Sequence, residues 1–124
     1  MANCRFAKIV VLVVEDEPLL RMNTVDMVEQ AGFEPIEAAN AKQAMQALEQ
    51  RDDIRIILSD IDMPPGMDGV ELVAIVRNRW PPIEIILVSG QVASGEVLLP
   101  ERGLFFSKPF RSQDLIAAMS RMAA

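Results

Sequence analysis

Short, continuous apolar segments alternate along this chain with segments of helical periodicity, and this alternation limits the possible folds more than any other feature. The first apolar segment, IVVLVV at residues 9–14, is rich in β-branched side chains, which is typical of a strand covered on both faces. The second apolar segment, at residues 33–38, contains Pro35 and is predicted to be an edge strand, because proline cannot donate a ladder hydrogen bond. The further predicted strands are FEPIEA, IRIIL, IEIILV and LFF, at residues 33–38, 54–58, 83–88 and 104–106.

Helices are predicted between these strands from capping residues and from apolar residues spaced three and four positions apart. Pro18 suits the first turn of a helix that continues to about Ala31. Asn40 is expected to cap a second helix, and Ser112 a last one. The expected apolar faces are Ala41, Ala44, Met45 and Leu48 in the second helix, Gly69, Leu72, Val73 and Val76 in the third, and Leu115, Ala118, Met119 and Met122 in the last.

This order of elements predicts an α/β fold, a (βα)5 doubly wound five-stranded parallel sheet with helices on both faces. The segment at 90–103 holds three glycines and a proline, so the fourth helix is expected to be short or irregular. A length of 124 residues suits a single domain, 1–124, with its core at about 8–122.

Composition excludes several classes of function. The net charge is −6 without a basic stripe, so direct binding of nucleic acid is not expected. No apolar run is long enough to span a bilayer and no signal core precedes the first strand, so we expect a cytoplasmic protein that does not act at a membrane. The absence of histidine and the single cysteine, Cys4, argue against zinc, disulfides and Ser-His or Cys-His catalysis.

Polar side chains follow four of the predicted strands. Because the carboxyl ends of parallel strands share one edge of the sheet, we expect these side chains to converge. Clustered carboxylates repel one another unless a cation joins them, and oxygen ligands without sulfur or imidazole favour Mg²⁺. A lysine and a hydroxyl suit a phosphoryl group, and one carboxylate could itself be the nucleophile. The residues are Glu15 and Asp16, Asp60 and Asp62, Ser89 and Gly90, and Ser107, Lys108 and Pro109.

Any one of these residues alone is more often a cap or a solvated surface residue, but their order along the chain is specific. The segments VLVVEDEP, LSDIDMPPGMDG, ILVSGQ and FFSKPF occur in that order. With them the chain resembles, over essentially its whole length, the receiver domain of two-component response regulators. The overall character is similar to single-domain receivers of alphaproteobacteria. The resemblance implies the flavodoxin-like receiver fold.

The resemblance also implies roles for single residues. Asp60 matches the phosphoacceptor, Lys108 the lysine that pairs with phosphoryl oxygens, and Ser89 the hydroxyl that binds the phosphoryl group and moves on activation. The implied Mg²⁺ ligands are Glu15, often through water, Asp16, Asp60 and the backbone carbonyl of Asp62.

Four further positions are implied to line the pocket or take part in switching. Phe105 matches the aromatic switch residue but lacks a hydroxyl, so its switching would depend on packing. Gly90 matches the small residue that keeps the pocket open, Gln91 flanks it, and Pro109 would follow a cis peptide bond. One extra residue between Pro64 and the Asp-Gly pair departs from the commonest receiver pattern.

The expected function is that of a stand-alone receiver, not an enzyme beyond its own phosphorylation and dephosphorylation. A sensor histidine kinase or histidine phosphotransfer protein would supply the phosphoryl group, and a downstream partner protein would respond. The resemblance makes the first helix a kinase-docking surface. Its exposed side would hold Arg21, Asn23, Asp26 and Gln30, with Leu19 and Met22 near the site.

Two alternatives remain open. A pseudo-receiver would bind a partner without phosphorylation, although the complete set of acids, hydroxyl and lysine argues against it. The DIDMP segment is also similar to the nucleophile motif of haloacid-dehalogenase-like phosphatases. That motif favours Thr or Val where this chain has Pro64, and it follows an early strand rather than the third.

Overall fold

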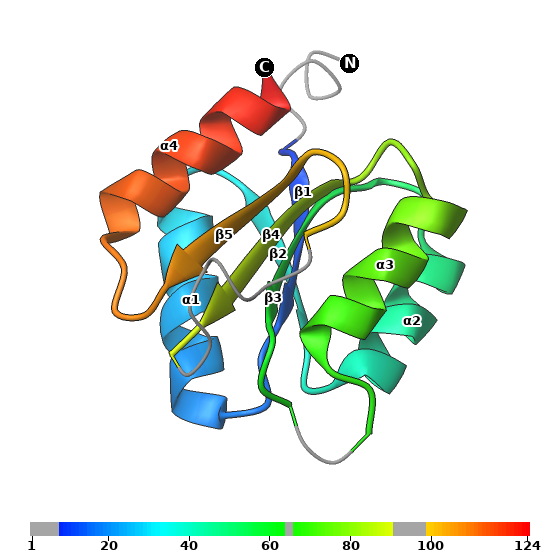
Figure 1. Cartoon of the computed structure of the whole chain (residues 1–124). Helices are drawn as coiled ribbons and strands as arrows, with labels where there is room; N and C mark the ends of the chain where they lie inside the picture. Colours follow the sequence, from blue (N-terminus) through cyan, green and yellow to red (C-terminus); the bar gives the residue numbers. More distant parts are fainter. Residues whose placement is uncertain (1–7, 64–65, 91–98) are drawn as a thin grey trace.

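The computed structural model describes residues 8–63, 66–90 and 99–124, which form one parallel sheet with helices on both faces (Figure 1). The strand order is β2-β1-β3-β4-β5. The strands are β1 (Val10–Val14), β2 (Glu34–Ala38), β3 (Ile54–Asp60), β4 (Glu84–Ser89) and β5 (Gly103–Ser107). The helices of these ranges are α1 (Pro18–Gln30), α2 (Ala41–Gln50), α3 (Gly69–Arg79) and α4 (Ser112–Ala123).

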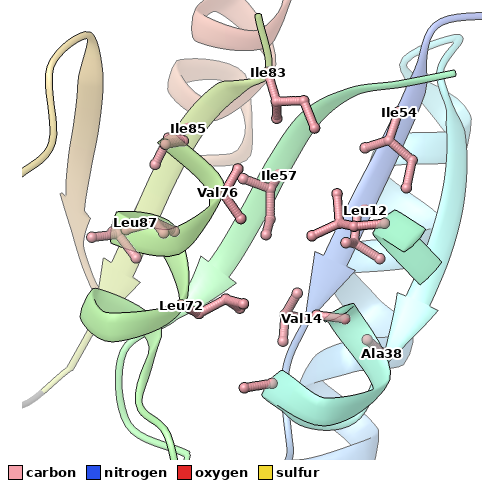
Figure 2. Close-up of a cluster of buried hydrophobic side chains, with 14 of the residues drawn as sticks. Leu12, Val14, Ala38, Ile54, Ile57, Leu72, Val76, Ile83, Ile85 and Leu87 are labelled. Carbon is pink, nitrogen blue, oxygen red and sulfur yellow. The ribbon is translucent and has the colours of Figure 1, made fainter. Parts of the chain in front are cut away.

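Each face of the sheet has its own apolar core, so alternate residues of one strand belong to different cores. Leu12 and Val14 of β1 pack on the side of α2 and α3, where Figure 2 shows them near Leu72 and Val76 of α3. Val11 and Val13 pack on the opposite side, with Val28 of α1 and with Leu115, Ala118 and Met119 of α4. Burial on both faces explains why the central strands are continuous apolar runs.

The predicted doubly wound α/β fold is therefore confirmed. β2, which contains Pro35, lies at an edge of the sheet as predicted. Most of the predicted short or irregular fourth helix lies outside the described residues, at 91–98. Within the described ranges, none of the helices has both the length and the apolar character needed to cross a membrane.

The predicted end of β3 is corrected, and the predicted cap of the second helix is confirmed. β3 does not end at Leu58, since Ser59 and Asp60 still pair with Leu87 and Val88 of β4. The capping of the second helix by Asn40 is confirmed, because its side chain accepts a hydrogen bond from the Gln43 backbone at 2.8 Å.

Ser112 does not cap the last helix. Arg111 occupies the N-cap with extended backbone angles, and no side chain caps the helix there. The reason is that the carbonyl of Arg111 already accepts the first helical hydrogen bonds, from Asp114 at 3.1 Å and Leu115 at 3.3 Å. Ser112 is thus the first residue inside α4.

The start of α3 packs directly on the backbone at the end of β3. Asp68 caps α3 and forms a capping box with Glu71. The next residue, Gly69, donates its backbone N–H to the carbonyl of Ile61 at 3.0 Å. A Cβ atom at Gly69 would overlap the backbone carbonyl of Asp60. Only glycine lets the helix approach this closely, and the approach holds the β3 end in place.

We expect Gly69→Ala to lower the free energy of unfolding by about 3 kcal/mol, because backbone atoms must move to admit a methyl group. Urea denaturation measures the change. The matched control is Asn78→Ala at an exposed position of the same helix, where an effect within about 0.5 kcal/mol is expected. Equal stability of the two variants would contradict the close packing.

Candidate functional site

The structure brings the predicted polar residues together at the carboxyl edge of the sheet, on the lower side of Figure 1. Backbone hydrogen bonds continue the parallel ladder beyond the strand ends and fix where the loops begin. The backbone N–H of Glu15 donates to the carbonyl of Ala38 at 3.0 Å, and the backbone N–H of Lys108 donates to the carbonyl of Ser89 at 2.8 Å. The side chains at this edge are therefore placed by the sheet itself.

Glu15, Asp16 and Asp60 form an acid cluster in which one carboxylate oxygen of each residue lies within 4.8 Å of the other two. Glu15 and Asp60 are each only 5% exposed, whereas Asp16 is more accessible. Three hard oxygen donors without sulfur or imidazole suit a Mg²⁺ ion, which commonly keeps several waters. This donor set fits the metal that the sequence predicted.

Lys108 bridges the two buried carboxylates. Its Nζ donates to Glu15 Oε1 and to Asp60 Oδ2, each at 3.2 Å. Burial disfavours the charged ammonium, but the attraction of Asp60 and Glu15 outweighs this, and the pKa of Lys108 is raised above its ordinary value. Lys108 is therefore a fixed cation beside Asp60.

The single positive charge of Lys108 does not fully offset the negative charge of the buried acid cluster. Burial raises the pKa of the Glu15 carboxyl from 4.5 to about 7, and the charge of Asp60 adds to the increase. The backbone N–H of Glu17, at 3.1 Å, and the Lys108 ammonium act in the opposite direction. A buried acid that holds its proton near neutral pH marks a place where further positive charge is favourable.

Ser89 and Asp62 make a contact that the sequence did not predict. The Ser89 hydroxyl, which is almost fully buried, donates to Asp62 Oδ2 at 2.8 Å. The backbone N–H of Asp62 donates to Asp60 Oδ1 at 3.2 Å. Asp62 is thus bonded through its side chain to Ser89 and through its backbone N–H to Asp60.

The remaining predicted residues lie around the cluster or beyond it. Phe105 is partly buried and packs against the core on the α2 and α3 side. Gly90 is exposed, and a Cβ there would make ordinary contacts with Lys108 at 3.6 Å. The Lys108–Pro109 peptide bond is cis, as the resemblance implied. Gln91 lies outside the described residues.

A cavity of about 400 Å³ opens beside the acid cluster, between α1 and the residues that follow β5. Its walls are mostly apolar. Leu20 and Met27 of α1 line it together with Phe110, and Asp60 and Lys108 also belong to its lining. The cavity therefore adjoins Glu15, Asp60 and Lys108 of the site.

The first helix departs from the sequence prediction at one position. Asn23, Asp26 and Gln30 are exposed as expected. The Arg21 side chain is only 20% exposed, because it turns back across the end of β1. The pattern of α1 alone could not reveal this, since the acceptors of Arg21 belong to other elements.

Comparison with known proteins identifies the family. The model of the response regulator receiver domain matches residues 11–120. The chain belongs to this family. The response regulator receiver protein CpdR of Brucella abortus is 30% identical over 115 residues, which are 90% of this chain and 94% of CpdR. A receiver protein from Sinorhizobium medicae, whose crystal structure is known, has a TM-score of 0.84 and 25% identity, covering 93% of this chain and 94% of that one.

Other relatives are much longer proteins. The sensor kinase CckA of Brucella abortus is 34% identical over 90% of this chain, but the match is 12% of the kinase. The response regulator protein FleR of Pseudomonas aeruginosa is 30% identical over 91% of this chain, and the match is 24% of FleR. The chain therefore spans a quarter or less of these two proteins.

The raised pKa of Glu15 predicts how the stability of the metal-free receiver depends on pH. Between pH 4.5 and about 7 the folded protein keeps a proton on Glu15 that the unfolded chain releases, so stability falls as pH rises. We expect Glu15 to account for a loss of about 2 kcal/mol over this range. Urea denaturation with a chelator at several pH values measures it. Glu15→Gln should remove this part of the slope, and an unchanged slope would contradict the assignment.

Proposed function

We propose that the domain, residues 1–124 with its core at about 8–122, accepts a phosphoryl group onto Asp60 in a Mg²⁺-dependent reaction. The observation that carries this proposal is the buried Asp60 carboxylate, which lies within 4.8 Å of two further acids and 3.2 Å from Lys108. Nothing in a merely structural turn requires two buried acids and a lysine together, because such groups are costly to desolvate.

In the proposed reaction an Asp60 oxygen attacks phosphorus, and an acyl phosphate bond forms as the bond to the donor breaks. With a phosphohistidine donor, the P–N bond electrons go to the imidazole nitrogen, which takes up a proton. Glu15, Asp16, Asp60 and the Asp62 carbonyl would hold Mg²⁺, which when bound supplies positive charge against the phosphate. Lys108 stays beside Asp60 and pairs with the phosphoryl oxygens. Beyond this transfer and the hydrolysis of the acyl phosphate, in which water takes the phosphoryl group and Asp60 regains its carboxylate, the domain would not act as an enzyme.

The signal would start at the same residues. The product carries about two negative charges where the Asp60 carboxylate carried one, and Ser89 can donate to the phosphoryl group only after its hydroxyl leaves Asp62. We infer that this exchange shifts a two-state equilibrium through β4 and β5. Phe105, which packs on the core from β5, would respond by packing because it has no hydroxyl.

The donor would be a sensor histidine kinase or a histidine phosphotransfer protein in the cytoplasm. The 124 residues contain no histidine, so the phosphohistidine lies outside them. Among the described residues, three of the four exposed large hydrophobic side chains lie near the start of α1: Leu19 (64%), Met22 (53%) and Leu20 (44%). Leu20 also lines the cavity to which Asp60 contributes. This apolar surface suits a helix of the donor. A downstream protein, not nucleic acid or a membrane, would read the product.

The first test is the intact mass of the chain after incubation with acetyl phosphate. We expect one added phosphoryl group that requires Mg²⁺ and is absent with a chelator and in Asp60→Asn. Lack of any adduct with acetyl phosphate and with phosphohistidine donors would favour a pseudo-receiver. Turnover of a simple phosphomonoester such as p-nitrophenyl phosphate would instead favour the haloacid-dehalogenase-like alternative.

A second prediction concerns the donor surface. The double variant Leu19→Ala/Met22→Ala should slow phosphoryl transfer from a phosphohistidine protein roughly thirtyfold, because two interface side chains worth about 1 kcal/mol each contribute about 2 kcal/mol together. Its reaction with acetyl phosphate should not change. Leu104→Ala, at an exposed apolar residue of β5, is the matched control. Equal slowing with both donors would argue against docking on α1.

A further inference from the structure

Arg21 lies across the turn that joins β1 to α1, although its sequence position predicted an exposed place on the helix. Its Nη1 donates to the backbone carbonyl of Glu15 at 2.8 Å. Its Nε donates to Glu37 Oε1 of β2 at 3.1 Å. The Arg21 backbone N–H donates to the Glu17 carbonyl at 2.9 Å as part of α1. One residue therefore ties the start of α1 to the ends of two strands.

The carbonyl that Arg21 holds belongs to the peptide bond between Glu15 and Asp16. The other side of Glu15 is held by β2, since its backbone N–H donates to the Ala38 carbonyl. Its carboxylate receives Glu17 N–H and Lys108 Nζ. Among the described residues, none forms such a hydrogen bond with the Asp16 carboxylate. The direction of this side chain therefore depends on the peptide bond that precedes it.

We propose that Arg21 is a positioning residue for the magnesium site. By fixing the peptide bond between Glu15 and Asp16, it directs both carboxylates toward Asp60. The inference rests on the proposed function, because it assumes that these acids bind Mg²⁺. Outer residues that orient metal ligands commonly affect metal affinity without touching the metal.

Because Arg21 is positively charged, the direction of the change in Mg²⁺ affinity on its removal tests the inference. A guanidinium near the acid cluster repels a divalent cation, so a residue that acted through its charge alone would weaken Mg²⁺ binding, and its removal would strengthen it. A positioning residue acts in the opposite direction, and its removal weakens binding. Glu37, which pairs with Arg21, offsets part of the charge effect.

The experiment is calorimetric titration of the full chain with Mg²⁺ in the native protein and in Arg21→Ala. We expect the dissociation constant to rise roughly tenfold in the variant. Arg21→Lys keeps a donor and a charge and should recover part of the affinity. The matched control is Arg51→Ala, because Arg51 pairs with Asp53 at 2.7 Å and with Glu34 at the opposite end of β2. Its removal should leave Mg²⁺ affinity unchanged.

A second readout separates positioning from loss of folding. With acetyl phosphate, Arg21→Ala should need more Mg²⁺ for half-maximal phosphorylation but reach the native rate at saturating Mg²⁺. A partly unfolded variant would not recover in this way. An unchanged or lower dissociation constant in Arg21→Ala would overturn the inference, as would equal weakening in Arg51→Ala.

The two proposals fail in different ways. If the native chain forms no phosphoryl adduct while its Mg²⁺ affinity depends on Arg21, the proposed function fails and the positioning role stands. If the adduct forms and Mg²⁺ affinity does not depend on Arg21, only the inference fails. A native chain without saturable Mg²⁺ binding would overturn the inference together with the metal dependence of the reaction.

Discussion

The arrangement at the site depends on two buried carboxylates that share one lysine. Glu15 and Asp60 come from neighbouring strands, β1 and β3, whereas Lys108 follows β5, two strands away from β3. The lysine must therefore reach past the end of β4 to bond both acids. Burial disfavours the charged form of both carboxylates, and their charges also repel each other. The shared ammonium offsets only part of this cost, and burial together with the charge of Asp60 raises the pKa of Glu15. The sheet supplies the rigidity that holds this unfavourable cluster together.

Much of the fold could be predicted because both faces of the sheet are covered. β1 and β4 are continuous apolar runs for that reason, and Pro35 marked the edge strand. The prediction ended β3 too early because Ser59 and Asp60 are polar. Strand pairing is a backbone property, however, and the ladder with β4 continues through both residues. The start of α4 was missed for the same reason. It is defined by the backbone carbonyl of Arg111, whereas the prediction relied on the capping preference of the Ser112 side chain.

The gathering of the acids could also be predicted, because topology alone brings the strand ends to one edge. The hydrogen bonds within the site could not. Ser89 ends β4 and meets Asp62 just beyond the end of β3, because the two strands pair and the Ile61 N–H continues their ladder to the Val88 carbonyl. Arg21 looked like a surface residue because helical periodicity describes one element at a time. Its acceptors lie on β2 and at the end of β1.

In this structure, the groups that are proposed to bind the phosphoryl group already form hydrogen bonds with carboxylates. Lys108 bonds Glu15 and Asp60, and Ser89 bonds Asp62. A phosphoryl group on Asp60 would compete for both donors with more charge than either carboxylate. In the proposed switch the energy would come from exchanging these partners, so it would be a difference between two satisfied arrangements. A reversible signal requires that this difference be small, because a large one would hold the domain in one state. Asp62, which is bonded to Ser89 and to Asp60, would then help to set how far the unphosphorylated state is favoured.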